Sequence, residues 1–200
     1  MRKYFVVFTL ATVSRICEAG LKVMNPPTLA EEIGNNGIIQ SSLANFGHLN
    51  YGQTSLGKVI RPRKENAFGC KPLTIEDFPD YFTPELLSMN RGPLNTFVLL
   101  SRGHCTNPTK VRNVENFGSN IALIGDEKDE DVTQIIMEDY DGSGFSIHIP
   151  AHMIDHLSYT KICQALDEKK EVYLQAELVI SKPENSIEMG VYWGSSLDLT

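Results

Sequence analysis

The chain has 200 residues, of which 42% are hydrophobic, so it is long and apolar enough to bury the core of one domain with tails. Its 25 acidic residues outnumber its 18 basic residues, and the net charge of −7 argues against nucleic acid or an anionic membrane as the main partner. After Gly20, no apolar run reaches the length that a membrane-spanning helix needs.

Residues 1–19 have the features of a secretory signal peptide. Arg2 and Lys3 make the start basic, residues 4–13 form a short apolar region, and small residues precede Gly20 at the spacing of a cleavage site. We therefore predict a signal peptide that is cleaved before Gly20. The rest of the chain would then reside in the secretory or endosomal lumen or outside the cell, where disulfides form.

Removal of the signal peptide would take Cys17 with it and leave Cys70, Cys105 and Cys163. Because three is an odd number, the count predicts one disulfide and one free thiol. Cys163 follows Ile162 on the apolar face of a predicted helix, which favours a buried free thiol over a reactive one.

Three short strands are predicted in the first part of the chain, over residues 21–24, 38–43 and 58–60. Residues 44–57 are rich in glycine and aromatic side chains and read as a loop. Residues 72–95 read as surface loop, with a short helical turn that Thr74 caps.

The clearest unit of the chain lies at residues 97–124. It begins with the apolar run 97–100, which predicts a buried strand, and ends with a second such run at 121–124. Between them, Asn107 is predicted to cap a helix that ends at Gly118, a residue suited to a left-handed C-terminal cap. A strand, a helix and a strand in this order predict a right-handed βαβ unit with two parallel strands.

The turn at residues 101–105 is where this unit would bind a ligand. It lies at the carboxyl end of the first strand and at the amino end of the helix, where N–H groups are unpaired. Arg102 adds a planar group with five donors at the same position. The alternative is that Arg102 is only a solvated turn residue.

The second half of the chain predicts further elements in the order strand, strand, turn or helix, helix and strand. These lie over residues 132–137, 145–149, 150–156, 159–169 and 171–180. The last strand alternates apolar and polar residues and is expected to be half-buried and antiparallel.

The pattern Phe-x-Leu-x-x-Arg-Gly-x-Cys over residues 97–105 belongs to a longer match. Four matching residues follow it, namely Lys110, Asn113, Asn116 and Gly118. NFGHLNYGQTSLGKVIRP and a Gly-Cys pair precede the pattern, and GDEKDE and IHIPAHMI follow it. In order and composition, residues 38–182 resemble the protease-associated (PA) domain, most closely the luminal PA domain of vacuolar sorting receptors.

The resemblance implies an α/β fold, a mixed β-sandwich or open barrel with two to three short helices outside it, over residues 20–182. It also implies that Cys70 and Cys105 form the disulfide. Residues 183–200 would be a linker or the start of a following module, because the segment around Trp193 is similar to one that follows the PA domain in sorting receptors.

The resemblance further implies a binding domain with no catalytic residues and no cofactor. Its partner would be a peptide or protein cargo, with soluble vacuolar or lysosomal hydrolases as candidates. The residues that would hold the cargo peptide are Gly47, His48, Tyr51 and Gly52 in the glycine-aromatic loop, and Arg102, Gly103, His104 and Cys105 in the turn. Two residues depart from the family pattern, which often has Asp at the position of His104 and Phe at that of Asn107.

Two other functions stay open for such a domain. Transmembrane RING-type ubiquitin ligases carry a similar luminal domain, although the Trp193 segment speaks against that architecture. Some secreted proteases carry an accessory domain of this kind, but no catalytic domain is found in this chain. Nothing in the sequence places a base beside a nucleophile, and we predict that the domain is not an enzyme.

Two motifs raise the question of metal binding. Residues 139–144, Asp-Tyr-Asp-Gly-Ser-Gly, copy the first half of an EF-hand loop, but Pro150 stands where the bidentate Glu would be. His148, His152 and His156 recur every fourth residue, yet the proline argues against a single helix through all three. We predict no specific site for calcium or zinc.

Overall fold

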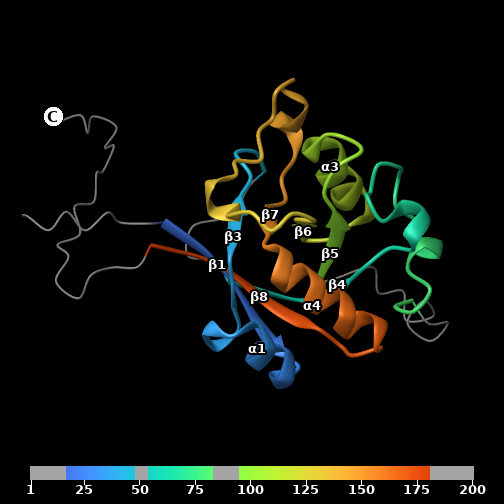
Figure 1. Cartoon of the computed structure of the whole chain (residues 1–200). Helices are drawn as coiled ribbons and strands as arrows, with labels where there is room; N and C mark the ends of the chain where they lie inside the picture. Colours follow the sequence, from blue (N-terminus) through green and yellow to red (C-terminus); the bar gives the residue numbers. More distant parts are fainter. Residues whose placement is uncertain (1–16, 48–53, 83–94, 181–200) are drawn as a thin grey trace, which may run out of the picture.

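Eight strands form one mixed sheet in the computed structural model of the chain, which describes residues 17–47, 54–82 and 95–180 (Figure 1). In chain order they are β1 (Cys17–Asn25), β2 (Ile38–Ile39), β3 (Ser41–Leu43), β4 (Thr54–Ile60), β5 (Thr96–Ser101), β6 (Ile121–Gly125), β7 (Ala151–Ile154) and β8 (Tyr173–Ile180). The order within the sheet is β2-β1-β8-β4-β5-β6-β7-β3.

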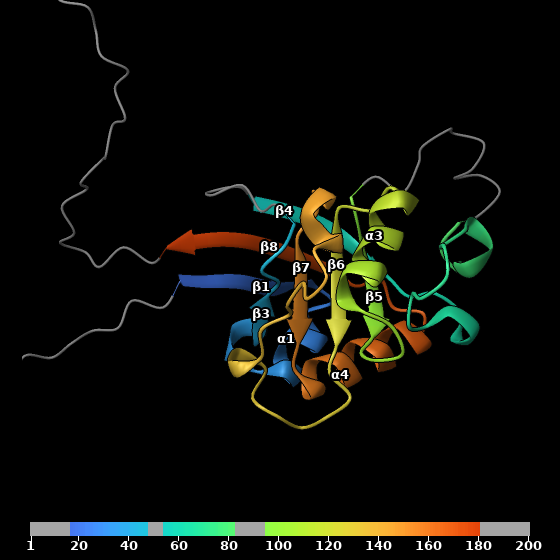
Figure 2. The same ribbon diagram turned by 90° about the horizontal axis from the view of Figure 1, so that it is seen from above.

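Strands β4 to β7 are parallel to one another, and the remaining pairs are antiparallel. Figure 2 shows β5, β6 and β7 running in the same direction. The two ends of the sheet are β2 and β3, and only Gln40 separates them in the chain. Residues 38–43 therefore link both ends and curl the sheet into a barrel-like shape, which protects strand edges from pairing with another chain.

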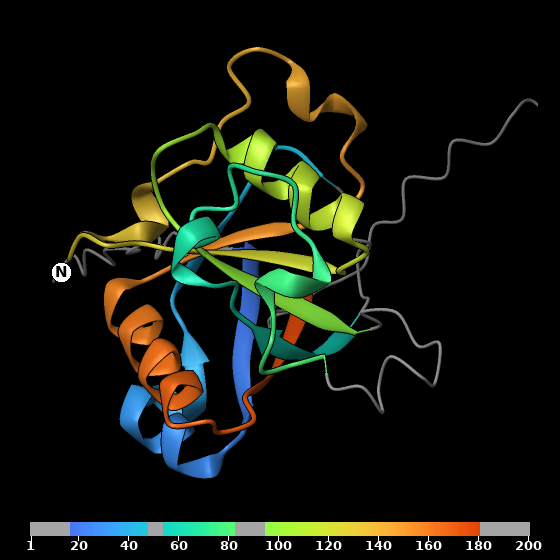
Figure 3. The ribbon, with the colours of Figure 1, turned by 90° about the vertical axis from the view of Figure 1, so that its right-hand side faces the viewer.

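Three α-helices cover the sheet in the described ranges. The helices α1 (Pro27–Ile33) and α4 (His156–Asp167) lie side by side, whereas α3 (Asn107–Phe117) lies on the other side of β5 and β6 (Figures 1 and 3). Because successive strand residues point to opposite faces, β5 contributes to both cores. Phe97 and Leu99 pack in the core that includes α1 and α4, and Val98 and Leu100 pack in the core that includes α3.

The predicted α/β fold and its βαβ unit are confirmed. β5 and β6 are parallel neighbours joined by α3, and Gly118 ends the helix with a φ of 91° in the left-handed region. One detail is wrong. The N-cap is Thr106 rather than Asn107, because the Thr106 hydroxyl accepts a hydrogen bond from the Thr109 N–H.

The region between β6 and β7 differs most from the prediction. The strands predicted over residues 132–137 and 145–149 are short 3₁₀ turns, Val132–Gln134 and Ser143–Ser146. Asp131 caps the first turn, and Phe145 in the second is 95% exposed although it is apolar. The strand lies instead at β7, where the sequence suggested a turn or helix.

Two helix boundaries also differ. The helix predicted from residue 159 begins at His156, because the Asp155 carboxylate accepts a hydrogen bond from Ser158 N–H (2.9 Å) and caps it there. The Pro26-Pro27 pair is a turn signal in the sequence, yet a helix, α1, follows it. Pro27 in fact occupies the start of α1, where its missing N–H is not needed.

β1 begins at Cys17, and the backbone of Cys17 pairs with that of Ile180. Three residues of the predicted signal peptide therefore lie in this strand. Cleavage before Gly20 stays a prediction, as does the boundary of the domain.

Candidate ligand-binding site

The carboxyl ends of three parallel strands meet at one edge of the sheet. Ser101 ends β5, Gly125 ends β6 and Ile154 ends β7, and the register pairs Ser101 with Gly125 and Gly125 with Ile154. The segments that follow these strands are 102–105, 126–131 and the start of α4. In open parallel sheets this edge is where ligands bind.

The turn at residues 102–105 has a left-handed backbone. Gly103 has a φ of 101° and His104 a φ of 66°, a conformation that a non-glycine residue rarely adopts. The His104 ring packs on the ring of Phe68, with 3.9 Å between the ring centroids. Contact with Phe68 therefore supports a strained residue at the exposed part of the turn.

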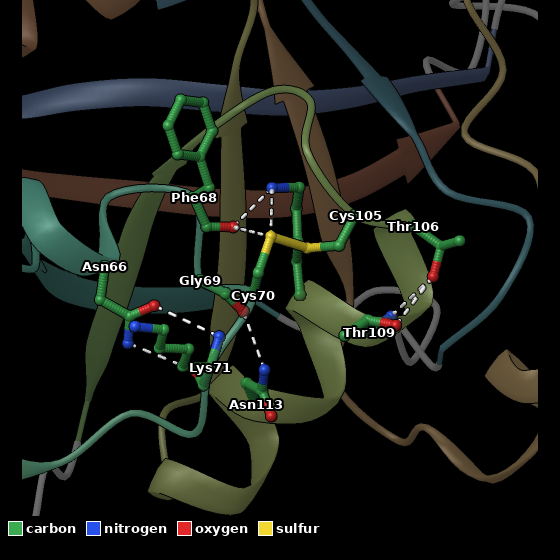
Figure 4. Close-up of a disulfide and its surroundings, with 10 residues drawn as sticks. Asn66, Phe68, Gly69, Cys70, Lys71, Cys105, Thr106, Thr109 and Asn113 are labelled. Carbon is green, nitrogen blue, oxygen red and sulfur yellow. Dashed lines mark hydrogen bonds between the residues drawn. A yellow bond between two sulfur atoms is a disulfide. The ribbon is translucent and has the colours of Figure 1, made fainter.

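A disulfide joins this turn to the segment 66–70, and the predicted Cys70–Cys105 bond is confirmed (Figure 4). The segment is itself held by neighbouring elements. The Asn113 side chain on α3 donates to the carbonyl of Gly69 (2.8 Å), and Ser101 N–H donates to the carbonyl of Ala67 (2.9 Å). The turn is thus covalently attached to a fixed part of the fold.

Arg102 is not the unpaired cation that the sequence led us to expect. Its Nη1 donates to Asp126 Oδ1 (3.0 Å) and to Glu130 Oε1. Burial alone would lower the pKa of Arg102, but the hydrogen bonds to Glu130 and Asp126 outweigh it and leave the pKa raised. With its side chain 32% exposed, Arg102 links the turn to the 126–131 segment.

The start of α3 also offers fewer donors than the sequence implies. Thr109 N–H is already bonded to the Thr106 hydroxyl, and Pro108 has no N–H. Few N–H groups at this part of the predicted ligand-binding turn therefore remain available to a ligand.

The segment at residues 126–131 makes this edge acidic. It contains five acidic residues and one lysine, Lys128. Asp126 is fully buried, its Oδ1 accepts from both Arg102 and the Lys128 N–H, and its Oδ2 has no protein partner. Sequence reasoning missed Asp126, although its position just after β6, beside the end of β5, could have indicated it.

A groove of about 780 Å³ opens next to this edge. Ser101 and Tyr159 line it, together with residues from the segments 58–67, 77–81 and 166–171. The Ser101 hydroxyl shares a hydrogen bond with the Tyr159 phenol (2.7 Å). Burial raises the pKa of the neighbouring Cys163, which is a free thiol.

Gly47 lies far from the turn. A Cβ on Gly47 would lie 2.2 Å from the Ile149 carbonyl oxygen, just before β7, whereas Arg102 follows the carboxyl end of β5. The two strands β5 and β7 belong to the parallel part of the sheet, so Gly47 and Arg102 lie at opposite ends of the strands. Gly47 is therefore not beside the turn with which we expected it to hold the peptide. His48, Tyr51 and Gly52 lie outside the described residues.

Gly47→Ala is expected to lower the free energy of unfolding by about 2 to 4 kcal/mol, because it adds a backbone clash to the strain of a φ of +81°. Gly142→Ala is the matched control. Gly142 has a φ of +73° but nothing within 4 Å of a Cβ, so only the strain of about 1 kcal/mol applies. Urea unfolding of both variants measures the difference, and equal losses would show that Gly47 is not in close contact.

The EF-hand-like motif forms a hydrogen-bonded loop, whereas the three histidines lie in different elements. In the EF-hand-like loop, Asp139 and Asp141 accept hydrogen bonds from the N–H groups of Gly144 and Ser143 (both 2.9 Å). The three histidines do not share a helix. His148 is exposed beside Glu115, His152 is buried in β7, and His156 is the first residue of α4.

Within the described ranges, no three His, Cys, Asp or Glu residues lie together in a way that could hold a metal ion. In the same ranges, no helix is both long and apolar enough to cross a membrane.

Known proteins resemble this chain in sequence and in fold. Vacuolar-sorting receptor 1 of Pisum sativum is 27% identical over 199 residues, which are 96% of this chain and 29% of the receptor. Vacuolar-sorting receptor 3 of Arabidopsis thaliana is 28% identical over 80% of this chain and 25% of the receptor. The chain thus spans less than a third of these relatives. No protein-family model matches it.

Two solved structures share the fold. The aminopeptidase from Aneurinibacillus sp. strain AM-1 has a TM-score of 0.50 and 12% identity, over 82% of this chain and 31% of the enzyme. BSAP, a zinc aminopeptidase from Bacillus subtilis, has a TM-score of 0.51 and 16% identity, over 80% of this chain and 30% of the enzyme. The recognition made from the sequence is confirmed: this chain is homologous to the protease-associated region of the vacuolar-sorting receptors and has the fold of the corresponding part of these aminopeptidases.

Proposed function

We propose that the chain is a non-catalytic luminal domain that binds a peptide segment of soluble cargo for sorting. The observation that carries the proposal is its similarity to vacuolar-sorting receptors across nearly its whole length, together with a disulfide that suits an oxidising lumen. Among the described residues, the site has a hydroxyl paired with a phenol and an arginine paired with carboxylates, which is no arrangement for nucleophilic catalysis.

The peptide would lie at the carboxyl ends of β5 and β6, over the Arg102–Cys105 turn and toward the groove beside Ser101. The turn would supply backbone groups, and Arg102 would contribute from its position against Asp126 and Glu130. Because backbone groups are common to all peptides, part of the recognition would tolerate sequence change, and the groove would supply selectivity.

Arg102→Ala is expected to weaken peptide binding about ten- to a hundredfold, since a charge-assisted hydrogen bond contributes about 1.5 to 3 kcal/mol. Arg102→Lys should restore only part of the affinity, because a compact ammonium lacks the planar fork of N–H donors that a guanidinium offers to a ligand. Calorimetry of the purified chain with a peptide from a lysosomal protease pro-region measures the effect.

The control is Arg112→Ala, which removes the same charge from α3 but at a residue that bonds to Ser143 and not to the turn. Circular dichroism must show that each variant is folded. Unchanged affinity in a folded Arg102→Ala variant would show that the peptide binds elsewhere. To test the absence of catalysis, aminoacyl-p-nitroanilides with added zinc should show no hydrolysis above buffer, and turnover in proportion to protein would contradict it.

A further inference from the structure

Lys110 on α3 is a buried cation beside the disulfide. Its residue is 0% exposed, and its Nζ donates to the carbonyl of Phe68 and lies 3.9 Å from the Sγ of Cys70. The Phe68 ring also faces the amine, with Nζ 5.4 Å from the ring centroid. The ammonium is therefore surrounded by a carbonyl, a ring and a sulfur.

This cation has no carboxylate in contact with it among the described residues, and Glu127 acts on it only from beyond ion-pair distance. No described carboxylate forms an ion pair with Lys110 within 4.0 Å. Burial accordingly lowers the pKa of Lys110 to about 8, which still leaves the amine mostly charged at neutral pH. A buried charge without a counter-ion in contact is unfavourable, and a thiolate at Cys70 would supply such a counter-ion.

We propose that the Cys70–Cys105 bond is a redox-sensitive disulfide that a small thiol such as glutathione opens, with Lys110 stabilising Cys70 as the departing thiolate. The two sulfurs differ in their surroundings. Cys105 lies in the turn between exposed neighbours, His104 and Thr106, whereas the Cys70 sulfur lies 3.9 Å from the buried amine. Attack on Cys105 therefore makes Cys70 the leaving thiolate, and its negative charge forms beside the Lys110 ammonium.

The exchange proceeds in two steps. A glutathione thiolate attacks Cys105 Sγ, the S–S bond breaks, and its electron pair leaves on Cys70 Sγ as a thiolate beside Lys110. A mixed disulfide then joins glutathione to Cys105. A second glutathione thiolate attacks the glutathione sulfur, releases Cys105 as a thiolate and forms oxidised glutathione, so two glutathione molecules supply the two electrons.

Opening the bond would separate residues 102–105 from the segment 66–70 that supports them. That consequence for binding rests on the proposed function, but the chemistry does not. The redox measurements use no peptide ligand. A failure of the redox proposal can therefore be distinguished from a failure of the binding proposal.

The first test is redox titration of the full chain in glutathione buffers, with the Cys70 peptide followed by mass spectrometry so that other cysteines do not interfere. Lys110→Met should make the disulfide about three- to tenfold harder to reduce, a shift of about 15 to 30 mV for a two-electron couple. Asn113→Ala is the matched control. It removes the hydrogen bond from the Asn113 side chain to the Gly69 carbonyl, which also holds the segment 66–70, but leaves the charge of Lys110 in place. It should leave the potential nearly unchanged.

Equal shifts in the two variants, or none in Lys110→Met, would overturn the proposal, because the lysine would then act only by holding the segment. A second measurement needs no variant at the lysine. Brief exposure of the wild-type chain to glutathione, followed by acid quenching, should trap the adduct on Cys105. An adduct on Cys70 would overturn the proposed direction of attack.

Discussion

Replacement of Cys70 and Cys105 by alanine together should lower the free energy of unfolding by about 4 kcal/mol. The bond joins residues 35 positions apart, and closing a loop of this length removes about that much conformational freedom from the unfolded chain. Domains are typically stable by about 5 to 15 kcal/mol, so this loss would remove between about a quarter and most of the stability.

Urea unfolding of the double variant measures this effect, and a change in m-value would reveal that the unfolded state has expanded. Cys163→Ala is the control. Cys163 is a half-buried free thiol, so its loss should cost only the packing of one small side chain. A double variant as stable as the wild type would mean that the disulfide fixes the turn at residues 102–105 but does not stabilise the fold.

The parts of the fold that the sequence predicts well are those in which each local pattern agrees with the tertiary structure. The apolar runs of β5 and β6 are buried on both faces, as parallel strands require, and Gly118 adopts the left-handed conformation that its position indicates. The disulfide was predictable only through the resemblance, because the count of cysteines left three possible pairs.

The strand β7 could not be predicted in this way because its sequence, Ala-His-Met-Ile, has neither alternation nor β-branched residues at most positions. It becomes a strand because it fills the place between β6 and β3, where all four of its residues are buried. In the loop before it, Phe145 suggests a strand, but nothing packs over its side chain. The tertiary position of each segment thus decided whether it became a strand.

The candidate site shows the same division. Arg102 was found from its place after β5, but its pairing with Asp126 and Glu130 joins residues 24 and 28 positions apart. Local pattern carries no information about such a contact. The pairing changes the interpretation of Arg102 from a free cation to a cation that already binds two carboxylates.

His152 is expected to make the domain less stable as the pH falls from 6.5 toward 4. Its ring is fully buried in β7, where Leu43 and Leu123 are its register partners, and neither ring nitrogen has a hydrogen-bond partner. Burial lowers the pKa of His152 from 6.5 to about 4, because a charged ring in this core would have no solvent and no anion.

The direction of the effect follows from proton uptake. Since the pKa in the folded state is below that in the unfolded state, the unfolded chain binds the proton first, and the contribution of His152 is complete above pH 6.5 and lost as the pH falls through 4. At pH 5 the loss is about 2 kcal/mol, and when complete it is about 3 kcal/mol. A lumen that acidifies would therefore weaken the fold.

His152→Leu tests this prediction, because an apolar side chain of similar size cannot take up a proton and leaves no buried polar atom unpaired. Urea unfolding at pH 7.5 and pH 5 should give a difference about 2 kcal/mol smaller in this variant than in the wild type. His148→Gln should keep the wild-type difference, since His148 is 80% exposed. If His152→Leu loses as much stability on acidification as the wild type does, the pH dependence arises from carboxylates, and the buried histidine takes no part in it.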